Sequence, residues 1–375
     1  MARRAPTHAP NIHSSRLGAC LCAFALLTAG CGTAAVDSGS ADSTTAASAT
    51  TASLPGPRAI EEEVSFRANG MTVHGTWRRP ARQGEPAPAV LLIAGSGPTD
   101  RDGNSAQLGG VDTLKTMAEL LSAEGVASLR YDKLGSGRTG LGPYASKAAD
   151  IGVGVFEREA AAALSYLAGR PGVDRRRLTV IGHSEGALFA LLLATKGRTP
   201  VHSLGLLQPL SRRYLDVISA QITAQIRAQL QAGAITKAQA TEVEDALASA
   251  VASLRAGGTV QANLPGGLSN VLSPASAKFL SEADRLNPPE LAAELKARTP
   301  VLLSCSDADI QVGCDDVEQL AAGLKQARAG TEFVRLTGVS HVLKEDPSRN
   351  PAHYGAPLPF SSQLKQAIQT FVSRA

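Results

Sequence analysis

From about residue 60 to the end of the chain, short apolar runs alternate with stretches of helical periodicity. The first segment, 62–80, alternates polar and apolar residues around Asn69-Gly70, which predicts an antiparallel hairpin. The apolar runs that predict strands lie at 89–95, 126–132, 177–184, 201–209, 299–307 and 332–338. The stretches that predict helices lie at 113–125, 156–169, 186–197, 315–329 and 360–373. This order predicts an α/β fold whose sheet is mostly parallel and doubly wound, after an N-terminal antiparallel hairpin.

The interval 210–297 interrupts this alternation between two of the predicted strands. Apolar residues recur there at helical spacing in two runs, which predict two amphipathic helices. The residues are Leu215, Ile218, Ile222, Ile226 and Leu230, followed by Val243, Leu247, Val251 and Leu254. An ordinary helical excursion would show the same pattern, but the position of the interval favours a helical cap insertion that covers a site at the edge of the sheet.

The N-terminal segment 1–30 has the pattern of an export signal. Its three arginines precede an apolar stretch, 17–30, which is too short to span a membrane and has the length of a signal peptide. The stretch ends in Leu-Leu-Thr-Ala-Gly-Cys, which resembles the lipobox of bacterial lipoproteins and implies lipidation of Cys31. A plain secretory signal cleaved nearby is the alternative. We therefore predict an exported protein that is lipid-anchored to the cell membrane or otherwise periplasmic or secreted.

Residues 31–59 are mostly small and polar and show no periodicity, so they bury too little apolar surface to fold. We predict a flexible tether there and one α/β domain over 60–375. The net charge of +4 depends on three arginines of the leader, and without residues 1–30 it falls to +1. With so little excess basic charge and only 4% aromatic residues, we expect no nucleic-acid partner.

The chain has five cysteines, of which Cys20 and Cys22 would leave with the signal and Cys31 would carry lipid. Cys305 and Cys314 then remain as an even pair in an oxidising compartment, where disulfides persist. A disulfide between them is one expectation, and two buried free thiols are the other.

Residues 182–186, Gly-His-Ser-Glu-Gly, fit the G-x-S-x-G pattern of a serine nucleophile. Glycine is so common in this chain that the pattern alone is weak evidence. The predicted strand 177–184 leads into it, and the predicted helix 186–197 leaves it. A strand-to-helix turn is the setting that such a nucleophile requires, so we predict that Ser184 is catalytic.

A serine hydroxyl needs a base and an orienting acid, and in enzymes with such a turn both follow the serine along the chain. Only three histidines follow Ser184, at His202, His341 and His353. His202 begins a predicted strand and His353 lies in a proline-rich stretch. His341 comes directly after the last predicted strand, where a loop can bring an imidazole to the nucleophile, so we predict that it is the base.

The acid is expected in the stretch that follows the predicted strand 299–307. Asp307 and Asp309 both lie just past this strand, and their spacing alone does not separate them. Asp315 and Asp316 begin the next predicted helix, where acidic residues are stabilised by free N–H groups.

Acyl transfer also needs N–H donors for the oxyanion. The backbone N–H of Glu185, directly after the nucleophile, is one natural donor. The second is expected in the polar, glycine-rich loop 95–104, from Ser96 or Gly97.

One further glycine pattern, Gly-Ser-Gly-Arg-Thr-Gly at 135–140, resembles a dinucleotide fingerprint. Gly142 and Pro143 follow it, so no helix begins there to bind a pyrophosphate. The sequence has no Walker A pattern, no H-E-x-x-H and no metal-type spacing of cysteine and histidine. We therefore expect no cofactor and no metal.

Six segments, in order, resemble the α/β-hydrolase superfamily and more narrowly its serine-aminopeptidase-like carboxylesterases. They are LLIAGSGPTDRDGNS, LRYDKLGSGRT, VIGHSEGAL, DIQVGCDDVEQL, VSHVLK and YGAPLPF. The resemblance implies an α/β-hydrolase fold with Ser184 as nucleophile, Asp309 as acid and His341 as base. It also implies a small-molecule ester substrate and an acyl-enzyme intermediate. A peptidase or thioesterase with the same triad, or a non-catalytic binding module on this fold, are the alternatives.

Overall fold

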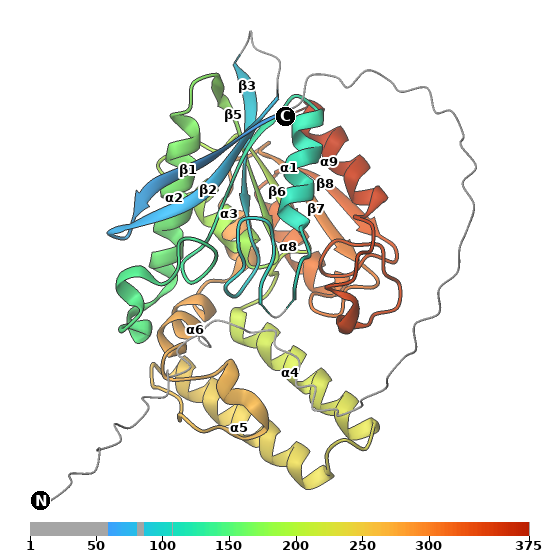
Figure 1. Ribbon diagram of the computed structural model, residues 1–375. Helices are drawn as coiled ribbons and strands as arrows, with labels where there is room; N and C mark the ends of the chain where they lie inside the picture. The colour runs from blue at the N-terminus through green and yellow to red at the C-terminus, as the bar shows by residue number, and fades with distance from the viewer. Residues whose placement is uncertain (1–58, 81–85, 107, 375) are drawn as a thin grey trace, which may run out of the picture.

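The computed structural model describes residues 59–80, 86–106 and 108–374, and eight strands form one sheet within them (Figure 1). The order across the sheet is β1-β2-β4-β3-β5-β6-β7-β8. The strands are β1 (Ile60–Ala68), β2 (Met71–Arg79), β3 (Ala87–Ile93), β4 (Ala127–Tyr131), β5 (Val173–His183), β6 (Ser203–Leu207), β7 (Pro300–Ser306) and β8 (Gly330–Leu336). Strand β2 pairs antiparallel with β1 and β4, and all other pairs are parallel. The prediction of a mostly parallel sheet after an antiparallel hairpin is confirmed.

The expected signal segment, the lipidation site Cys31 and nearly all of the tether lie outside the described residues. Within the described ranges, no helix is long and apolar enough to cross a membrane.

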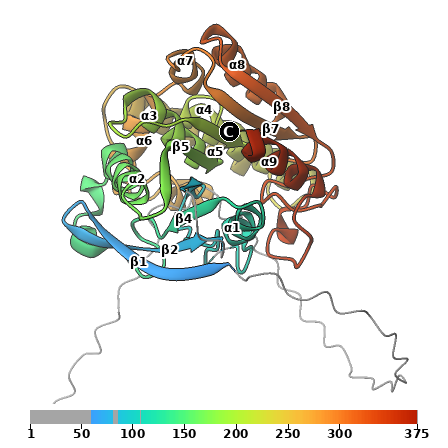
Figure 2. The same cartoon turned by 90° about the horizontal axis from the view of Figure 1, so that it is seen from above.

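Helices cover both faces of the sheet, as Figure 2 shows from above. They are α1 (Thr113–Ala123), α2 (Val153–Ala168), α3 (Gly186–Lys196), α4 (Tyr214–Gln231), α5 (Lys237–Arg255), α6 (Ala277–Asp284), α7 (Pro288–Ala293), α8 (Cys314–Gln326) and α9 (Ser362–Arg374). Successive residues of β3 point to opposite faces. Val90 and Leu92 pack in the cluster that holds α1 and α9, whereas Leu91 packs in the cluster that holds α2 and α3. This burial on both faces explains why the strands read as continuous apolar runs.

The chain between β6 and β7 forms α4, α5, a short 3₁₀ helix at Pro265–Asn270, α6 and α7. Helices α4, α5 and α6 gather beyond one edge of the sheet (Figure 1). The apolar spacing predicted α4 and α5, and most of these apolar residues are buried. Ile222 and Val251 are half-buried, and Leu230, near the end of α4, is 39% exposed. The apolar spacing alone did not reveal that Leu230 is exposed to solvent.

At the turn from β5 to α3, the end of β5, the start of α3 and the end of β3 lie unusually close together. Ser184 at its centre has φ 55°, in the left-handed region. A Cβ at Gly182 would lie 2.2 Å from the carbonyl oxygen of Gly186, and a Cβ at Gly186 would lie 2.3 Å from the carbonyl oxygen of Ile93. Both glycines of the pattern are therefore required by packing, because any side chain would collide with backbone.

We predict that Gly186→Ala lowers the free energy of unfolding by about 3 kcal/mol, because the added methyl group meets backbone that cannot move alone. Urea denaturation followed by circular dichroism measures the change. Gly110→Ala is the matched control, since Gly110 is exposed and a Cβ there meets nothing within 4 Å, and its stability stays within about 0.5 kcal/mol of wild type. Equal stability of the two variants would contradict the packing argument.

Candidate active site

The structure brings Ser184, His341 and Asp309 together in one chain of hydrogen bonds. His341 Nε2 lies 3.0 Å from Ser184 Oγ, and its Nδ1 lies 2.8 Å from Asp309 Oδ2. The serine sits between β5 and α3, the aspartate follows β7 and the histidine follows β8. All three are nearly shielded from solvent, with 6%, 5% and 4% exposure for Ser184, His341 and Asp309. Three segments that are far apart in sequence thus meet where parallel strands end.

Asp309 and not Asp307 faces the histidine. Oδ1 of Asp309 accepts the backbone N–H groups of Gln311 at 2.8 Å and Val312 at 3.0 Å, which leaves Oδ2 for the imidazole. Asp307 is exposed and accepts the N–H of Gly338 at 2.7 Å. The two aspartates that sequence spacing did not separate therefore have different environments.

Two residues that the sequence analysis did not single out bind the backbone of the loop that carries His341. His183 Nε2 lies 2.7 Å from the carbonyl oxygen of His341. Burial, helped by the neighbouring His341, lowers the pKa of His183 to about 3, so its ring is neutral and donates its N–H to that carbonyl. The Gln208 amide, in the orientation that suits its neighbours, donates to the carbonyls of Ser340 at 3.1 Å and His341 at 2.9 Å. His183 lies inside the recognised serine pattern, whereas nothing in the sequence marks Gln208.

The expected oxyanion donors lie around the serine. Ser96 and Gly97 line a cavity of about 70 Å³ together with Ser184 and His341. Ser96 also lines a smaller cavity, of about 20 Å³, with Ser184 and Glu185. Within the described part of the chain, the N–H groups of Ser96, Gly97 and Glu185 donate to no protein acceptor. Unpaired donors beside a nucleophile are what an oxyanion requires.

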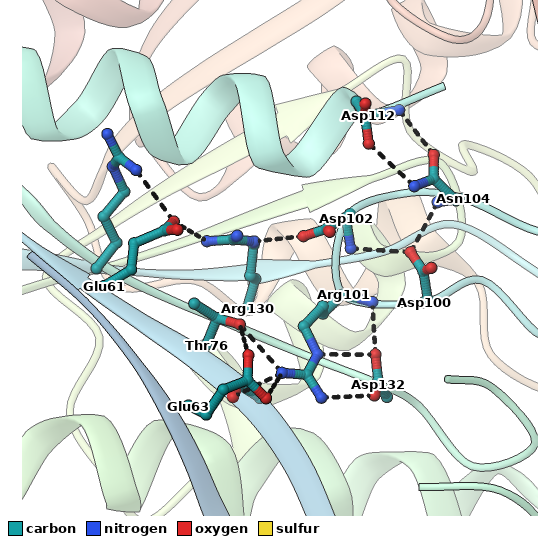
Figure 3. A network of polar contacts seen from close by, with 12 residues as sticks. Glu61, Glu63, Thr76, Asp100, Arg101, Asp102, Asn104, Asp112, Arg130 and Asp132 are labelled. Carbon is teal, nitrogen blue, oxygen red and sulfur yellow. Dashed lines mark hydrogen bonds and ion pairs between the residues drawn. The ribbon is translucent and has the colours of Figure 1, made fainter. Parts of the chain in front are cut away.

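The loop after β3 that carries Ser96 is fixed by a buried ion pair (Figure 3). Arg101 binds both carboxylate oxygens of Asp132, at 3.1 Å through Nε and 2.8 Å through Nη2. Its Nη1 also donates to Glu63 of β1 at 2.7 Å and to Thr76 of β2 at 3.0 Å. Burial by itself would raise the pKa of Asp132, but the hydrogen bonds from Arg101 outweigh it and the pKa is lowered. The loop is thereby attached to β1, β2 and the end of β4.

Asp100 and Asp102, the other acidic residues of the loop after β3, also make hydrogen bonds that fix this loop. Asp100 Oδ1 accepts the N–H groups of Asp102 and Asn104, each at 2.9 Å. Asp102 Oδ1 accepts a hydrogen bond from Nε of Arg130 on β4 at 2.7 Å (Figure 3). The polar composition of this segment therefore reflects an internally bonded loop, which is how its backbone can stay rigid near the serine.

The glycine pattern 135–140 has a packing role in the same network. Gly137 has φ 45°, and a Cβ there would lie 2.2 Å from the carboxyl carbon of Asp132. The N–H of Arg138 donates to Asp132 Oδ2 at 2.8 Å. The segment thus wraps around the carboxylate that holds Arg101.

A larger groove adjoins the cavity at the serine. It has a volume of about 530 Å³ and lies between α4, α5, the 3₁₀ helix and the loops that carry Ile310 and Tyr354. Leu108 and Gln311 line both the groove and the 70 Å³ cavity, so the two are adjacent. Apolar residues that line the groove include Ile222, Ile226, Ile235, Val243, Leu268 and Val271.

A disulfide joins Cys305, near the end of β7, to Cys314, the first residue of α8. These two cysteines bracket the loop that carries Asp309. Among the described residues, no group of three or more histidine, cysteine, aspartate or glutamate side chains is placed to hold a metal ion.

The sequence matches no protein-family model and no curated protein. Solved structures do match in fold. Est1E from Butyrivibrio proteoclasticus, bound to ferulic acid, is 17% identical, with a TM-score of 0.52 over 83% of this chain and 98% of that one. The Pyrococcus furiosus esterase Pf2001 is 16% identical, with a TM-score of 0.52 over 84% and 91% of the two chains. DcsB with its substrate analogue is 15% identical, with a TM-score of 0.52 over 84% and 99%. At these identities the likeness establishes a shared fold.

We predict that reduction raises the intact mass of the protein by two hydrogens, because Cys305 and Cys314 are bonded. Replacing both by alanine is expected to lower the free energy of unfolding by about 2–3 kcal/mol, the entropy of closing so short a loop. Mass spectrometry and urea denaturation measure the two effects. Unchanged mass on reduction would rule out the bond.

Proposed function

We propose that this chain, which has the α/β-hydrolase fold, is a serine hydrolase that cleaves carboxylic esters through an acyl-enzyme. The fold agrees with the expectation from the sequence and is shared with the esterase structures above. The observation that carries the proposal is the hydrogen-bond chain from Ser184 Oγ through His341 to Asp309. A serine at this turn, with an imidazole at 3.0 Å and a carboxylate behind it, is arranged for nucleophilic catalysis.

In the acylation step, His341 Nε2 takes the proton of Ser184 as Oγ attacks the ester carbonyl carbon. Asp309 keeps the Nδ1–H of His341 in place and stabilises the imidazolium that forms. The carbonyl oxygen becomes an oxyanion, for which the free N–H groups of Ser96 and Glu185 are the donors. His341 then returns the proton to the leaving alcohol, and the acyl group stays on Ser184.

In the deacylation step, His341 takes a proton from water, whose oxygen attacks the acyl carbon. Collapse of the second oxyanion breaks the bond to Ser184 Oγ, which regains the proton from His341. The products are the carboxylic acid and the free enzyme, so the cycle needs neither a metal nor an organic cofactor.

We further propose that the larger group of the ester lies in the 530 Å³ groove, which the 70 Å³ cavity at the serine adjoins. The 70 Å³ cavity at the serine suits a short acyl group. The apolar side chains that α4 and α5 present to the groove suit a longer aliphatic or aromatic group.

We predict that Ser184→Ala reduces hydrolysis of p-nitrophenyl butanoate to background. Asp309→Asn lowers kcat by a factor on the order of 10³–10⁴, because the imidazole loses the acceptor that fixes its tautomer. Asp307→Asn is the matched control and keeps kcat within about threefold, since among the described residues the Asp307 carboxylate accepts only the N–H of Gly338. Initial rates followed by nitrophenolate absorbance measure all three.

Wild-type protein that hydrolyses the ester no faster than Ser184→Ala would contradict the proposal and favour a binding module. Hydrolysis of peptide or thioester substrates in preference to esters would leave the triad in place and change the substrate class.

We also predict that Ile222→Trp, which fills part of the groove, lowers kcat/KM for p-nitrophenyl dodecanoate by about tenfold or more. The short butanoate ester is affected by less than about threefold. Leu230→Trp, on the same helix but exposed and outside the groove, changes neither. A chain-length series of esters measures the effect, and equal losses on short and long esters would place the long group elsewhere.

A further inference from the structure

A lysine is buried directly beside the nucleophile turn. Lys133, in the loop after β4, has a side chain only 3% exposed. Its Nζ donates a hydrogen bond to the carbonyl oxygen of Gly95 and lies 3.6 Å from Glu185 Oε1. Burial lowers the pKa of this lysine, and the charge of Glu185 opposes that effect. One ammonium group therefore touches the segment before Ser96 and the residue after Ser184.

The partner carboxylate is held from a second side. The hydroxyl of Tyr214, the first residue of α4, donates to Glu185 Oε2 at 2.5 Å. Lys133, Glu185 and Tyr214 are each 5% exposed or less, so the whole group is removed from water. A second buried acid, Glu159 of α2, accepts the N–H of Leu134, and its pKa is raised to about 7 by burial.

Stability alone gives no reason to keep this pair. Removing a lysine and a glutamate from water costs several kcal/mol for each ion, and well-packed apolar residues usually replace such a pair without loss. A buried ion pair next to a reacting serine is therefore better explained by what its atoms hold in place. Both partners of Lys133 belong to segments that carry an expected oxyanion donor.

The contact between Lys133 and the Gly95 carbonyl also fixes the direction of the Ser96 N–H. All peptide bonds of the described residues are trans, so the carbonyl of Gly95 and the N–H of Ser96 belong to one plane and point in opposite directions. When the ammonium group binds the carbonyl, the N–H is directed away from Lys133. Ser96 also lines the cavity that it shares with Ser184 and Glu185. A cation on the carbonyl also polarises the peptide and strengthens its N–H as a donor.

We infer that Lys133 is the positioning residue of the oxyanion hole and sets the direction of both N–H donors, at Ser96 and Glu185. It acts on Ser96 through the Gly95 carbonyl and on Glu185 through the carboxylate. Lys133 itself contacts neither substrate nor the reacting atoms. This inference rests on the proposed ester hydrolysis, because only that reaction gives the two donors an oxyanion to bind.

The test compares Glu185→Gln with the double variant K133M/E185Q. Both lack the Glu185 charge and keep its backbone N–H, so they differ only in Lys133. Glu185→Gln leaves Lys133 without its carboxylate partner, but Nζ, charged or neutral, still donates to the Gly95 carbonyl, so the comparison isolates that contact. Neither the double variant nor wild type buries an unpaired charge at this pair, and melting temperatures check that each variant is folded. The readouts are kcat and KM for p-nitrophenyl butanoate at one pH, with Ser184→Ala as the background.

The expected result is a kcat for K133M/E185Q that is about 10–100-fold below that of Glu185→Gln, with KM within about threefold. Loss of an oxyanion donor has this signature, because the donors bind the transition state and not the ground-state ester. A role in folding alone would move the melting temperature and leave kcat of the folded enzyme unchanged. Equal kcat for the two folded variants would overturn the inference and make Lys133 a counter-ion of Glu185 only.

Lys133→Arg provides the second variant if the double variant does not fold. It keeps the charge for Glu185, but the planar guanidinium cannot occupy the position of the ammonium at the Gly95 carbonyl. We expect at least a tenfold lower kcat at similar KM, and wild-type kcat in Lys133→Arg would overturn the inference. A wild-type protein no faster than Ser184→Ala would contradict the proposed function and the inference together.

Discussion

The buried carboxylate of Asp132 is the contact on which the geometry around the serine depends. It binds Arg101 with both oxygens, and Arg101 in turn reaches β1 and β2. The next residue along the chain, Lys133, binds the beginning of the same loop at Gly95. Two neighbouring residues of opposite charge thus hold the loop after β3 at two points. The segment that carries Ser96 has no regular secondary structure, so these charged contacts replace the backbone ladder that fixes the strands.

Local patterns were sufficient for much of the fold and for part of the site. Asn69-Gly70 marked the hairpin because both residues adopt positive φ, and continuous apolar runs marked strands that are buried on two faces. Ser184 was recognisable because the glycines around it are required by contacts within and beside one turn. His341 was recognisable because few histidines follow the serine. These are features that a sequence displays within a few residues.

The rest of the site depends on contacts between distant segments, which no local pattern records. His183 meets the carbonyl of His341 across 158 residues of chain, and Gln208 reaches the same carbonyl from the end of β6. The spacing of Asp307 and Asp309 alone did not separate them, although the resemblance implied Asp309, and in the structure the direction of the backbone after β7 separates them. Ile222 and Leu230 likewise share one apolar row, although one lines the groove and the other faces solvent.

The hydrogen bond between Tyr214 and Glu185 attaches the beginning of α4 to the turn that carries Ser184, and this has a mechanical consequence. Helix α4 has 18 residues and is therefore about 27 Å long. If it pivots about Tyr214 by about 10°, its far end moves by about 5 Å while the hydroxyl stays within bonding distance of the carboxylate. The point about which the helix would rotate therefore lies beside Ser184. Any widening of the groove through this motion is greatest at the end of α4 that is remote from Ser184 and smallest beside Ser184.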